Sequence, residues 1–235
     1  MERAALITGG SSGIGLAIAR MLRDEGFSLT LASRRLERVE AAAAELGATA
    51  VAADVADAEA CAQLLAGHRE RFGRLDVLVN SAGIGIAGRV EDLPEKHLDL
   101  QLGVNLRGLF LVTQAAIPLL RESRGWIVNL ASIAGTIPSP GLAIYGATKA
   151  AVISLTRSLN EELDGDGVRA VALCPGFVDT PMAAWAGLKG EEMIQPEDCA
   201  EIVRMLLRLS PRARIPQVVI ERVGSVNGDV PLGGA

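Results

Sequence analysis

Near its N-terminus the chain reads Thr8-Gly9-Gly10-Ser11-Ser12-Gly13-Ile14-Gly15, directly after the apolar run of residues 4–8. A segment of helical periodicity, residues 13–25, follows. Glycines allow a tight strand-to-helix turn and a close approach of the backbone to a pyrophosphate, which the helix N-terminus attracts through its free N–H groups and its dipole. The stretch therefore predicts a βα unit that binds phosphate groups. The alternative is a Gly/Ser turn that binds no ligand.

Apolar runs alternate with longer segments of helical periodicity along the whole chain. Most of the apolar runs are continuous, which is typical of strands that are covered on both faces. Strands that alternate with helices of this length form βαβ units around a parallel sheet. We predict strands at residues 4–8, 28–32, 49–53, 76–80, 125–131, 168–174 and 217–220, and helices at residues 13–25, 35–46, 58–72, 98–123, 145–163 and 196–209.

No Pro/Gly/Ser-rich linker, repeat or low-complexity segment divides the sequence. The predicted fold class is therefore α/β, with one Rossmann-like, doubly wound domain over residues 1–235 and a parallel sheet of about seven strands with helices on both faces. The segments richest in turn residues, 83–88, 137–141 and those after Pro175, all follow the carboxyl ends of predicted strands. Ligands bind at this edge of an open parallel sheet, so we expect the site there.

Composition and charge argue against several classes of partner. Hydrophobic residues make up 49% of the chain and charged residues 22%, which suits a domain with a large core. The net charge is −5 and the pI about 5.2, so we expect no binding to nucleic acid. No run approaches the roughly 18–20 apolar residues of a membrane span, and the apolar stretch near Met1 is too short for a signal peptide. We therefore expect no membrane partner.

The cysteines and histidines do not suggest a metal site. Cys61, Cys174 and Cys199 are odd in number, far apart and without CxxC spacing, which favours neither disulfides nor zinc. This usage indicates a reducing compartment, and we expect a cytoplasmic protein. His68 and His97 lie in polar stretches of helical pattern, and we expect both at the surface.

The glycine stretch has the spacing Gly-x-x-x-Gly-x-Gly, and it resembles the loop Thr-Gly-x-x-x-Gly-Ile-Gly of the short-chain dehydrogenase/reductase family. The resemblance covers nearly the whole chain, because further motifs follow in the family's order. Asp54-Val55 stands where the family contacts adenine, and Pro175-Gly176, with Val178 and Thr180, where it contacts the nicotinamide amide. Asn80-Ser81-Ala82-Gly83 replaces the usual Asn-Asn-Ala-Gly, so Ser81 is a mild departure in a segment that in the family stabilises the sheet and lines the cofactor.

This resemblance implies a nicotinamide dinucleotide cofactor and a set of residues that bind it. The predicted cofactor-binding residues are Gly9, Ser11, Ser12, Gly13, Ile14, Gly15, Ser33, Arg34, Asp54, Val55, Asn80, Ala82, Gly83, Tyr145, Lys149, Pro175, Gly176, Val178 and Thr180. We expect no metal ion among them.

The end of the second predicted strand bears on the choice of cofactor. Enzymes selective for NAD(H) typically have Asp or Glu there, which binds the ribose 2′-hydroxyl and would repel a 2′-phosphate. Here Ser33 takes that place and Arg34 follows, and the planar fork of donors on an arginine suits a phosphate. We predict a preference for NADP(H), with NAD(H) possible, although Ser12 stands where many NADP-users have a basic residue. The alternative is that Arg34 and Arg35 only solvate a helix start.

Tyr145-Gly146-Ala147-Thr148-Lys149 places the only tyrosine of the chain four residues before a lysine, so both side chains lie on one helical face. A tyrosine with an ordinary pKa of about 10 is a poor base at neutral pH, and a nearby ammonium lowers that pKa. By spacing alone, Tyr145 could be structural and Lys149 a surface residue. Downstream of a cofactor loop, however, the pair matches the family's Tyr-x-x-x-Lys, and we predict that Tyr145 transfers the proton.

The resemblance implies two further catalytic residues. Ser132 follows the fifth predicted strand, where a hydroxyl can hydrogen-bond the substrate oxygen and stabilise charge on it. Asn105 lies inside a helical pattern, although Asn is a mediocre helix former. In the family the matching Asn holds a water that connects the lysine to solvent. The predicted catalytic set is Tyr145, Lys149, Ser132 and Asn105, while a turn role for Ser132 and a structural role for Asn105 stay open.

Together these residues predict an oxidoreductase that transfers a hydride between a nicotinamide and a small carbonyl compound or secondary alcohol. Residues 181–195 are expected to form a short substrate lid over an apolar pocket. The side chains expected in the lid are Met182, Trp185, Leu188 and Met193, and those expected in the pocket wall are Ile84, Ile133, Leu142 and Phe177.

The predicted helix at residues 98–123 carries apolar residues almost all round, more than one sheet-facing stripe requires. Members of the family pair this helix with a twofold mate, so we expect a homodimer or a homotetramer. Many tetramers in the family use a C-terminal strand that ends in Asp-Gly-Gly. Here the last strand instead runs into Glu221-Arg222-Val223-Gly224, and we predict a flexible tail at residues 227–235.

Two other function classes stay open at this stage. A sensor or scaffold could keep the fold and bind the cofactor without catalysis, although the set Ser132, Tyr145, Lys149 and Asn105 is intact. A sugar-nucleotide epimerase or dehydratase of the family's longer branch would need a larger substrate region after Thr180. Turnover of free cofactor with carbonyl compounds separates the first class from these two.

Overall fold

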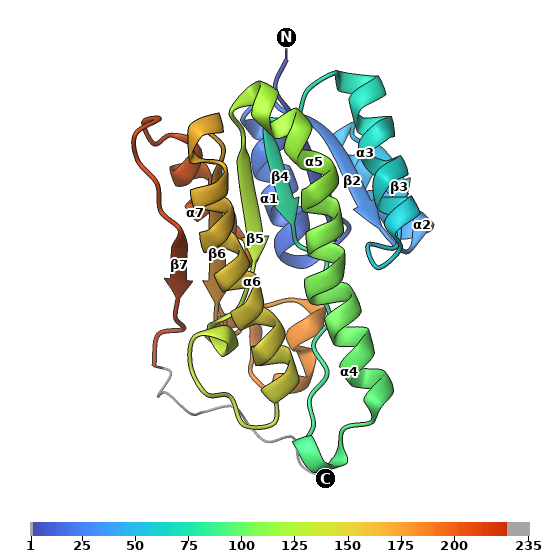
Figure 1. The fold of residues 1–235 in the computed structure, drawn as a ribbon. Coiled ribbons are helices and arrows are strands. Elements are labelled where there is room, and N and C mark those ends of the chain that lie inside the picture. The colour runs from blue at the N-terminus through green and yellow to red at the C-terminus, as the bar shows by residue number, and fades with distance from the viewer. Residues whose placement is uncertain (1, 225–235) are drawn as a thin grey trace.

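The computed structural model describes residues 2–224. Seven strands form one parallel sheet in the order β3-β2-β1-β4-β5-β6-β7, and in Figure 1 all arrows run to the lower edge. The strands are β1 Ala4–Thr8, β2 Ser28–Ser33, β3 Thr49–Ala52, β4 Val77–Asn80, β5 Trp126–Leu130, β6 Arg169–Pro175 and β7 Gln217–Ile220. This is the predicted doubly wound α/β fold.

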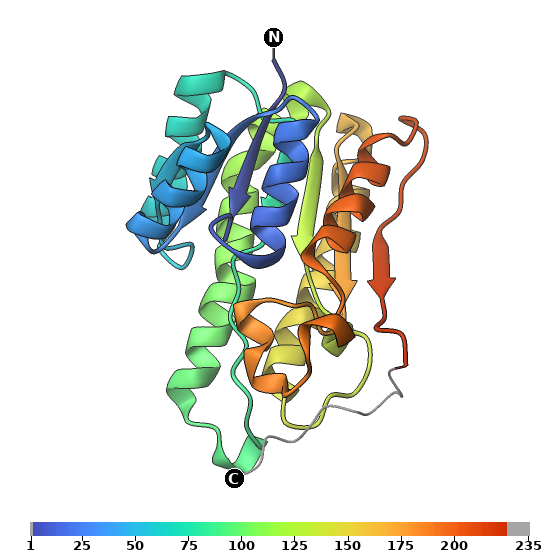
Figure 2. The same ribbon diagram turned by 180° about the vertical axis from the view of Figure 1, so that it is seen from behind.

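Helices cover both faces of the sheet, as successive crossovers between parallel strands require. Helices α1, α2 and α7 pack on the face seen in Figure 2, and α3, α5 and α6 pack on the face seen in Figure 1. The helices are α1 Gly13–Asp24, α2 Leu36–Leu46, α3 Ala58–Phe72, α4 Glu95–Leu102, α5 Leu109–Ser123, α6 Ala143–Glu162 and α7 Pro196–Leu207.

The core is split by the sheet into two apolar layers, because successive residues of a strand point to opposite faces. Ile7 belongs to the layer under α1, α2 and α7, whereas its neighbour Leu6 belongs to the layer under α3 and α5. Both side chains are fully buried. Continuous apolar strands are therefore explained by burial on both faces.

The predicted elements are confirmed, with shifts at their ends. Most strand and helix ends lie within one or two residues of the predicted ones. The largest shift is at the start of the predicted helix 98–123, which begins at Glu95 directly after Pro94. Its first turn, Glu95 to His97, is polar and carries no apolar periodicity, which explains why the pattern missed it.

That long helix is not regular throughout. A π-helical segment, Gly103–Gly108, joins α4 to α5 and contains Asn105. The whole unit, Glu95–Ser123, is long and apolar enough to cross a membrane by length and composition alone. It packs instead along β4 and β5 and against α3 and α6, as the core helix of the domain.

His68 is a correction to the sequence analysis. It was expected at the surface, but its side chain is 2% exposed and lies in the buried stripe of α3 with Cys61, Leu64 and Leu65. Nδ1 is 2.8 Å from Oγ1 of Thr30, and Nε2 is 3.0 Å from the carbonyl oxygen of Arg74. Residues 61, 64, 65 and 68 have the spacing of one helical face, and this pattern predicts that His68 is buried. The charged residues next to His68 in the sequence made the pattern hard to recognise. His97 stays partly exposed.

The strand order decides where a ligand can bind. From β1 the chain builds outward to β2 and β3, and it then returns to place β4 on the other side of β1. The loops after β1 and β4 therefore leave the sheet in opposite directions and open a crevice between them. The predicted tail, residues 227–235, lies outside the described residues.

Candidate active site

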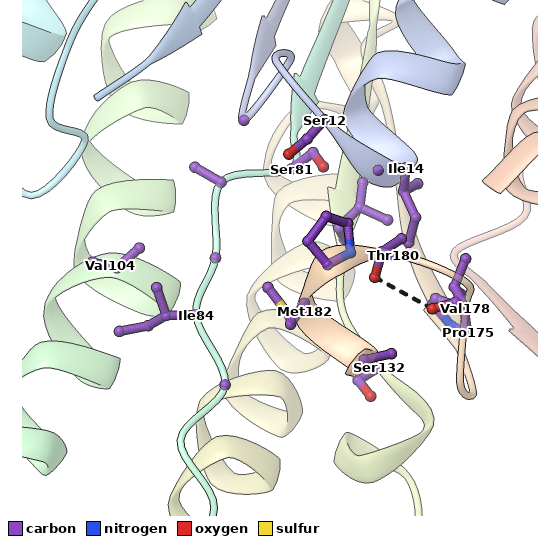
Figure 3. A pocket seen from close by; sticks show the side chains of 18 of the residues that line it. Ser12, Ile14, Ser81, Ile84, Val104, Ser132, Pro175, Val178, Thr180 and Met182 are labelled. Atoms are coloured by element: carbon purple, nitrogen blue, oxygen red, sulfur yellow. Dashed lines mark hydrogen bonds between the residues drawn. The ribbon is translucent and has the colours of Figure 1, made fainter. Parts of the chain in front are cut away.

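A cavity of about 690 Å³ follows the carboxyl edge of the sheet. The loops after β1 to β6 line it, so the segments that the sequence analysis singled out meet in one place. Figure 3 shows Ile84 and Val104 on one side of this cavity and Pro175, Val178 and Thr180 on the other. Thr180 is fixed there by a 3.3 Å hydrogen bond from its hydroxyl to the carbonyl oxygen of Val178.

The glycines of the first loop are required by close packing. Gly9 has a φ of +65°, and a Cβ there would lie 2.7 Å from the backbone oxygen of Ser81. A Cβ at Gly15 would lie 2.5 Å from the backbone oxygen of Gly9. Only glycine allows the loop to fold back on itself and on the segment after β4.

The N-terminus of α1 opens onto the cavity and lacks a cap of its own. Ser12 is the N-cap residue, but its side chain makes no capping hydrogen bond, and the first turn contains no acidic residue. Gly9, Ser11, Ser12, Gly13 and Ile14 line the cavity at this point. Uncapped N–H groups at the positive end of a helix dipole form an anion site, and this one fits a pyrophosphate.

One end of the cavity is strongly basic. Ser33 and Arg34 line it, as do Arg35 and Arg38, which the sequence analysis did not place in the site. The three arginines are exposed, and within residues 2–224 no carboxylate forms an ion pair with them. This end therefore presents guanidinium donors with no acidic side chain paired to them.

Most of the predicted cofactor residues reach the cavity, and three do not. Val55, Ala82, Gly83, Pro175, Gly176, Val178 and Thr180 line it together with the glycine loop. Gly15 lies behind Gly9. The Asp54 carboxylate accepts from the backbone N–H of Ala56 at 3.0 Å. Asn80 is buried, and its amide donates to Thr113 and to Asn129 at 2.9 and 2.8 Å. Asn80 therefore contributes by fixing β4 against β5.

Tyr145 and Lys149 lie one turn apart in α6, and both line the cavity. The Lys149 side chain is 5% exposed, and its Nζ donates to the carbonyl oxygen of Leu130 at 2.6 Å. That nitrogen is 5.6 Å from the centre of the Tyr145 ring. Ser132 lies two residues after the end of β5, and its hydroxyl accepts from the backbone N–H of Ala134 at 3.2 Å.

Burial shifts the pKa values of both titrating groups. Burial raises the pKa of Tyr145, and its hydrogen bond with Ser132 acts in the opposite direction. The sequence predicts a lowered tyrosine pKa, whereas in the structure burial is the largest cause of the shift and raises that pKa. Burial also lowers the pKa of Lys149 to about 8. At neutral pH the structure therefore holds a neutral phenol beside an ammonium.

Asn105 does not line the cavity, because its side chain is used within the protein. Its Oδ1 accepts from the backbone N–H of Ile84 at 2.8 Å, and its Nδ2 donates to the Ile84 carbonyl at 2.9 Å and to Thr148 at 3.1 Å. Both N–H groups of the amide are thus occupied. A water beside Asn105 would therefore have to donate its hydrogen bonds to oxygen atoms that still have a free lone pair. The role of Asn105 in a proton relay stays a prediction.

The wall beyond Tyr145 is apolar. Phe177 and Trp185 make an edge-to-face contact with ring centres 6.0 Å apart, and both line the cavity. Met182 and Trp185 belong to the 3₁₀ turn Pro181–Ala186, within the predicted lid. Ile84, Ile133 and Leu142 also line the cavity, as expected, whereas Leu188 and Met193 are not among its lining residues. Two backbone hydrogen bonds, Asp179 to Ile194 and Ile194 to Phe177, fix the far end of this segment.

Several lining residues were missed by sequence reasoning. Gly85 packs against the Tyr145 ring, Val104 comes from the π-helical segment, and Ser139 lies in the loop before α6. None of them stands in a motif with a recognisable spacing. Arg38 had a signal, since it lies four residues after Arg34 at the start of a helix.

The sequence of this chain matches a family model described as short chain dehydrogenase over residues 3–189. That range contains the glycine loop, the Ser132, Tyr145 and Lys149 side chains, and the segment after β6. The chain belongs to the short-chain dehydrogenase family. It is an oxidoreductase of that family.

Relatives and solved structures agree with this membership. An uncharacterized oxidoreductase of Staphylococcus epidermidis is 36% identical over 225 residues, which is 94% of this chain and 98% of that protein. An alcohol dehydrogenase from the archaeon Thermococcus sibiricus, complexed with 5-hydroxy-NADP, has a TM-score of 0.89 and 34% identity over 95% of this chain and 98% of its own.

Two further solved structures show that cofactors differ among similar chains. A 3-ketoacyl-(acyl-carrier-protein) reductase from Brucella melitensis, complexed with NADH, has a TM-score of 0.86 and 31% identity, covering 93% of this chain and 96% of its own. A serine dehydrogenase complexed with NADP⁺ has a TM-score of 0.86 and 27% identity, covering 92% and 94%. Use of NAD(P) is thus supported for the family, and the choice between the two forms in this chain needs an argument from its own residues.

Proposed function

We propose that this short-chain dehydrogenase uses NADP(H) and interconverts a small apolar carbonyl compound and the matching secondary alcohol. The observation that carries the proposal is the cavity that joins an arginine-rich end at Arg34 to the pair Tyr145 and Ser132. The two ends follow β2 and β5, which are three strand spacings apart, so they are separated by about 14 Å across the sheet. An extended dinucleotide can connect two such points.

The residues present fit a dinucleotide at three places. The uncapped N-terminus of α1 fits the pyrophosphate, because the loop glycines keep this approach free of side chains. Val55, Ala82 and Gly83 offer apolar surface and backbone beside it, and Val178 and Thr180 line the far side. When bound, the cofactor supplies or accepts the hydride.

Selectivity for NADP(H) is proposed from the charges at the basic end. Ser33 leaves no carboxylate there to repel a 2′-phosphate, and Arg34, Arg35 and Arg38 provide charge-assisted donors. The alcohol dehydrogenase and the serine dehydrogenase described above were solved with an NADP form, which supports this choice. The reductase solved with NADH shows that the fold alone does not determine it.

The chain's own chemistry is proton transfer and charge stabilisation. In the reductive direction the neutral phenol of Tyr145 donates a proton to the carbonyl oxygen, and the raised pKa keeps that proton in place at neutral pH. The Ser132 hydroxyl holds the same oxygen. The ammonium of Lys149 stabilises the phenolate that remains. In the oxidative direction the same groups act in reverse.

The substrate is proposed to be neutral and apolar near its carbonyl. Met182, Phe177 and Trp185 form one wall and Ile84 and Leu142 another. Of the lysine and arginine side chains in the described part of the cavity lining, only Lys149 comes from the loops and helix around Tyr145, while Arg34, Arg35 and Arg38 follow β2. A substrate carboxylate would find no arginine partner on this wall. The segment 181–195 is proposed to act as the lid.

The proposal extends to assembly and location. A largely apolar groove runs along α4, the π-helical segment and α5, beside α6. Leu102, Leu106, Phe110 and Leu155 line it together with Asp99 and Arg107, and Phe110 is 46% exposed. We propose that a second copy of the chain covers this groove in a homodimer or homotetramer. The three cysteines are free and buried, in keeping with the proposed cytoplasmic location.

The decisive experiment is an assay of the purified protein with NADPH and with NADH. Oxidation of the cofactor is followed by its absorbance, with matched pairs of apolar ketones and the corresponding keto acids. We expect turnover of ketones with NADPH, and lower kcat/KM for each keto acid and for NADH. The variant Tyr145→Phe is the control for background oxidation. Tight NADPH binding without turnover of any carbonyl compound would favour the sensor or scaffold instead.

A further inference from the structure

Gln101, in the last turn of α4, is a polar side chain with no exposed surface. Its Oε1 accepts a 3.2 Å hydrogen bond from the backbone N–H of Ile86. Its Nε2 is buried and has no hydrogen-bond partner among residues 2–224. Neither the family motifs nor the mechanism above assigns this residue a role.

Gln101 acts together with Asn105, which follows one turn later on the same helical face. Asn105 holds both the N–H and the carbonyl of Ile84, and Gln101 holds the N–H of Ile86. The side-chain amides of Asn105 and Gln101 therefore bind the backbone on either side of Gly85. The segment 84–86 has no helical or strand hydrogen bonds of its own, so these contacts decide its path.

Gly85 is the point where this segment meets the catalytic group. A Cβ at Gly85 would lie 3.7 Å from Cδ2 and Cε2 of the Tyr145 ring and 3.9 Å from the sulfur of Met182. Ile84 and Gly85 also line the cavity. A displacement of the segment would therefore change both the wall seen by the substrate and the packing of the tyrosine ring.

The unpartnered Nε2 makes a space-filling role a poor explanation. An aliphatic side chain would fill the same volume without burying a donor that bonds to no described residue. The free-energy cost of burying this donor is explained if the Oε1 atom of the same side chain is needed to hold a segment of the active site. We propose that Gln101 is a positioning residue that fixes residues 84–86 and thereby determines how the carbonyl substrate is held beside Tyr145.

This inference rests on the proposed function, because its kinetic consequence concerns the carbonyl substrate. Gln101 is not among the residues that line the cavity, and the segment that it holds, residues 84–86, is not among the predicted cofactor-binding residues. Loss of its hydrogen bond should therefore affect KM and kcat/KM for the substrate and leave the affinity for NADPH within about twofold. A defect in folding alone would not separate the two ligands in this way.

The test compares two variants of similar size with opposite chemistry. Gln101→Met keeps the volume and removes the acceptor, whereas Gln101→Glu keeps an oxygen acceptor at the same place. Burial raises the pKa of the introduced carboxyl, so the test is run at mildly acidic pH, where it stays neutral. We expect Gln101→Met to lower kcat/KM for the best ketone of the panel by roughly tenfold, and Gln101→Glu to retain most of it.

The Tm values of the two variants should rank opposite to their kcat/KM values: Gln101→Met should have the higher Tm, because a methionine is buried at lower cost than a carboxyl. Thr30→Val is the matched control, since it removes one buried hydrogen bond, to His68, at a residue that is not among those lining the cavity. It should lower Tm without changing KM. Equal kinetics of the Met and Glu variants, or loss of kcat/KM in proportion to Tm across all three, would overturn the inference.

A second measurement does not depend on turnover. Amide hydrogen exchange at Ile86 should be faster in Gln101→Met than in wild type and in Gln101→Glu, because the N–H loses its acceptor. If no carbonyl compound is turned over, the proposed function fails while this result still reports on the segment. If exchange at Ile86 is the same in all three proteins, the positioning role fails even when the enzyme is active.

Discussion

The ammonium nitrogen of Lys149 lies 5.6 Å from the centre of the Tyr145 ring while it donates a hydrogen bond to the carbonyl of Leu130. One carbonyl at the end of β5 thus fixes the charge that faces the tyrosine. Because burial lowers the pKa of Lys149 to about 8, this charge is present at neutral pH and is lost just above it. The relationship between the two residues makes the reaction sensitive to pH.

The first prediction concerns that pH dependence. In the reductive direction the rate should be highest below about pH 8 and fall as the pH rises through that value, because neutral Lys149 no longer stabilises the phenolate of Tyr145. The measurement is kcat at saturating NADPH and ketone across this range. Lys149→Met should be slow at every pH and lose the inflection. An unchanged inflection in that variant would assign it to another group.

The second prediction concerns Tyr145 itself. Tyr145→Phe removes the phenolic proton and leaves the ring against Gly85, so turnover should fall by at least a few hundredfold with little change in Tm. NADPH binding, measured by fluorescence titration, should stay close to wild type. Ser132→Ala should show a smaller loss, because the tyrosine can still donate its proton. A Phe variant with most of the wild-type rate would contradict the assignment.

The third prediction concerns the basic end of the cavity. Arg34→Ala should lower the ratio of kcat/KM for NADPH to that for NADH by about ten- to a hundredfold, since one charge-assisted contact is worth roughly 1.5–3 kcal/mol. Arg38→Ala should act in the same direction. Arg212→Ala, a change outside the cavity lining, is the control. If wild type uses both cofactors equally, or the ratio does not move in Arg34→Ala, selectivity has another origin.

The fourth prediction concerns the buried histidine. Burial lowers the pKa of His68 to about 4, whereas the unfolded chain has a value of about 6.5. Between these values the unfolded state binds more protons, so stability is complete above about pH 6.5 and falls as the pH drops toward 4. The loss amounts to about 3 kcal/mol.

Urea unfolding at several pH values checks this prediction. In His68→Leu the titrating group is absent, so the difference in unfolding free energy from wild type should shrink as the pH falls from about 6.5 to about 4. The variant should be less stable at neutral pH, because Thr30 loses the partner of its hydroxyl. A difference that is constant with pH would mean that His68 does not titrate in this way.

The fifth prediction concerns assembly. Phe110→Glu places a charge in the groove along α4, the π-helical segment and α5, and it should convert the oligomer to a monomer. Mass determination by light scattering at micromolar concentration provides the measurement. Leu36→Glu is the control, since Leu36 is similarly exposed, at 50%, but lies outside this groove. A monomeric wild-type protein would rule out the proposed assembly.

The fold and the catalytic pair could be predicted because they depend on local patterns. The apolar strands, the helices between them, the glycine loop and the Tyr145/Lys149 spacing each lie within one short stretch of sequence. Gly85 and Gln101 could not be found in this way, because their roles depend on which segments the sheet brings together, whereas Arg38 was indicated only by its spacing of four residues from Arg34. Burial also explains two differences from the sequence analysis. His68 lies in the core although its neighbours are charged, and the Tyr145 pKa is raised although a lysine lies nearby.

The strand order separates two groups of site residues, one on each side of β1. Residues that can choose between cofactors follow β2, whereas residues that can choose between substrates follow β4, β5 and β6. The glycine loop lies between them, and there Gly9 packs on the backbone of Ser81. Changes at the two ends should therefore combine additively. If the proposed function holds, substitutions after β2 should change the cofactor preference and leave the substrate preference unchanged.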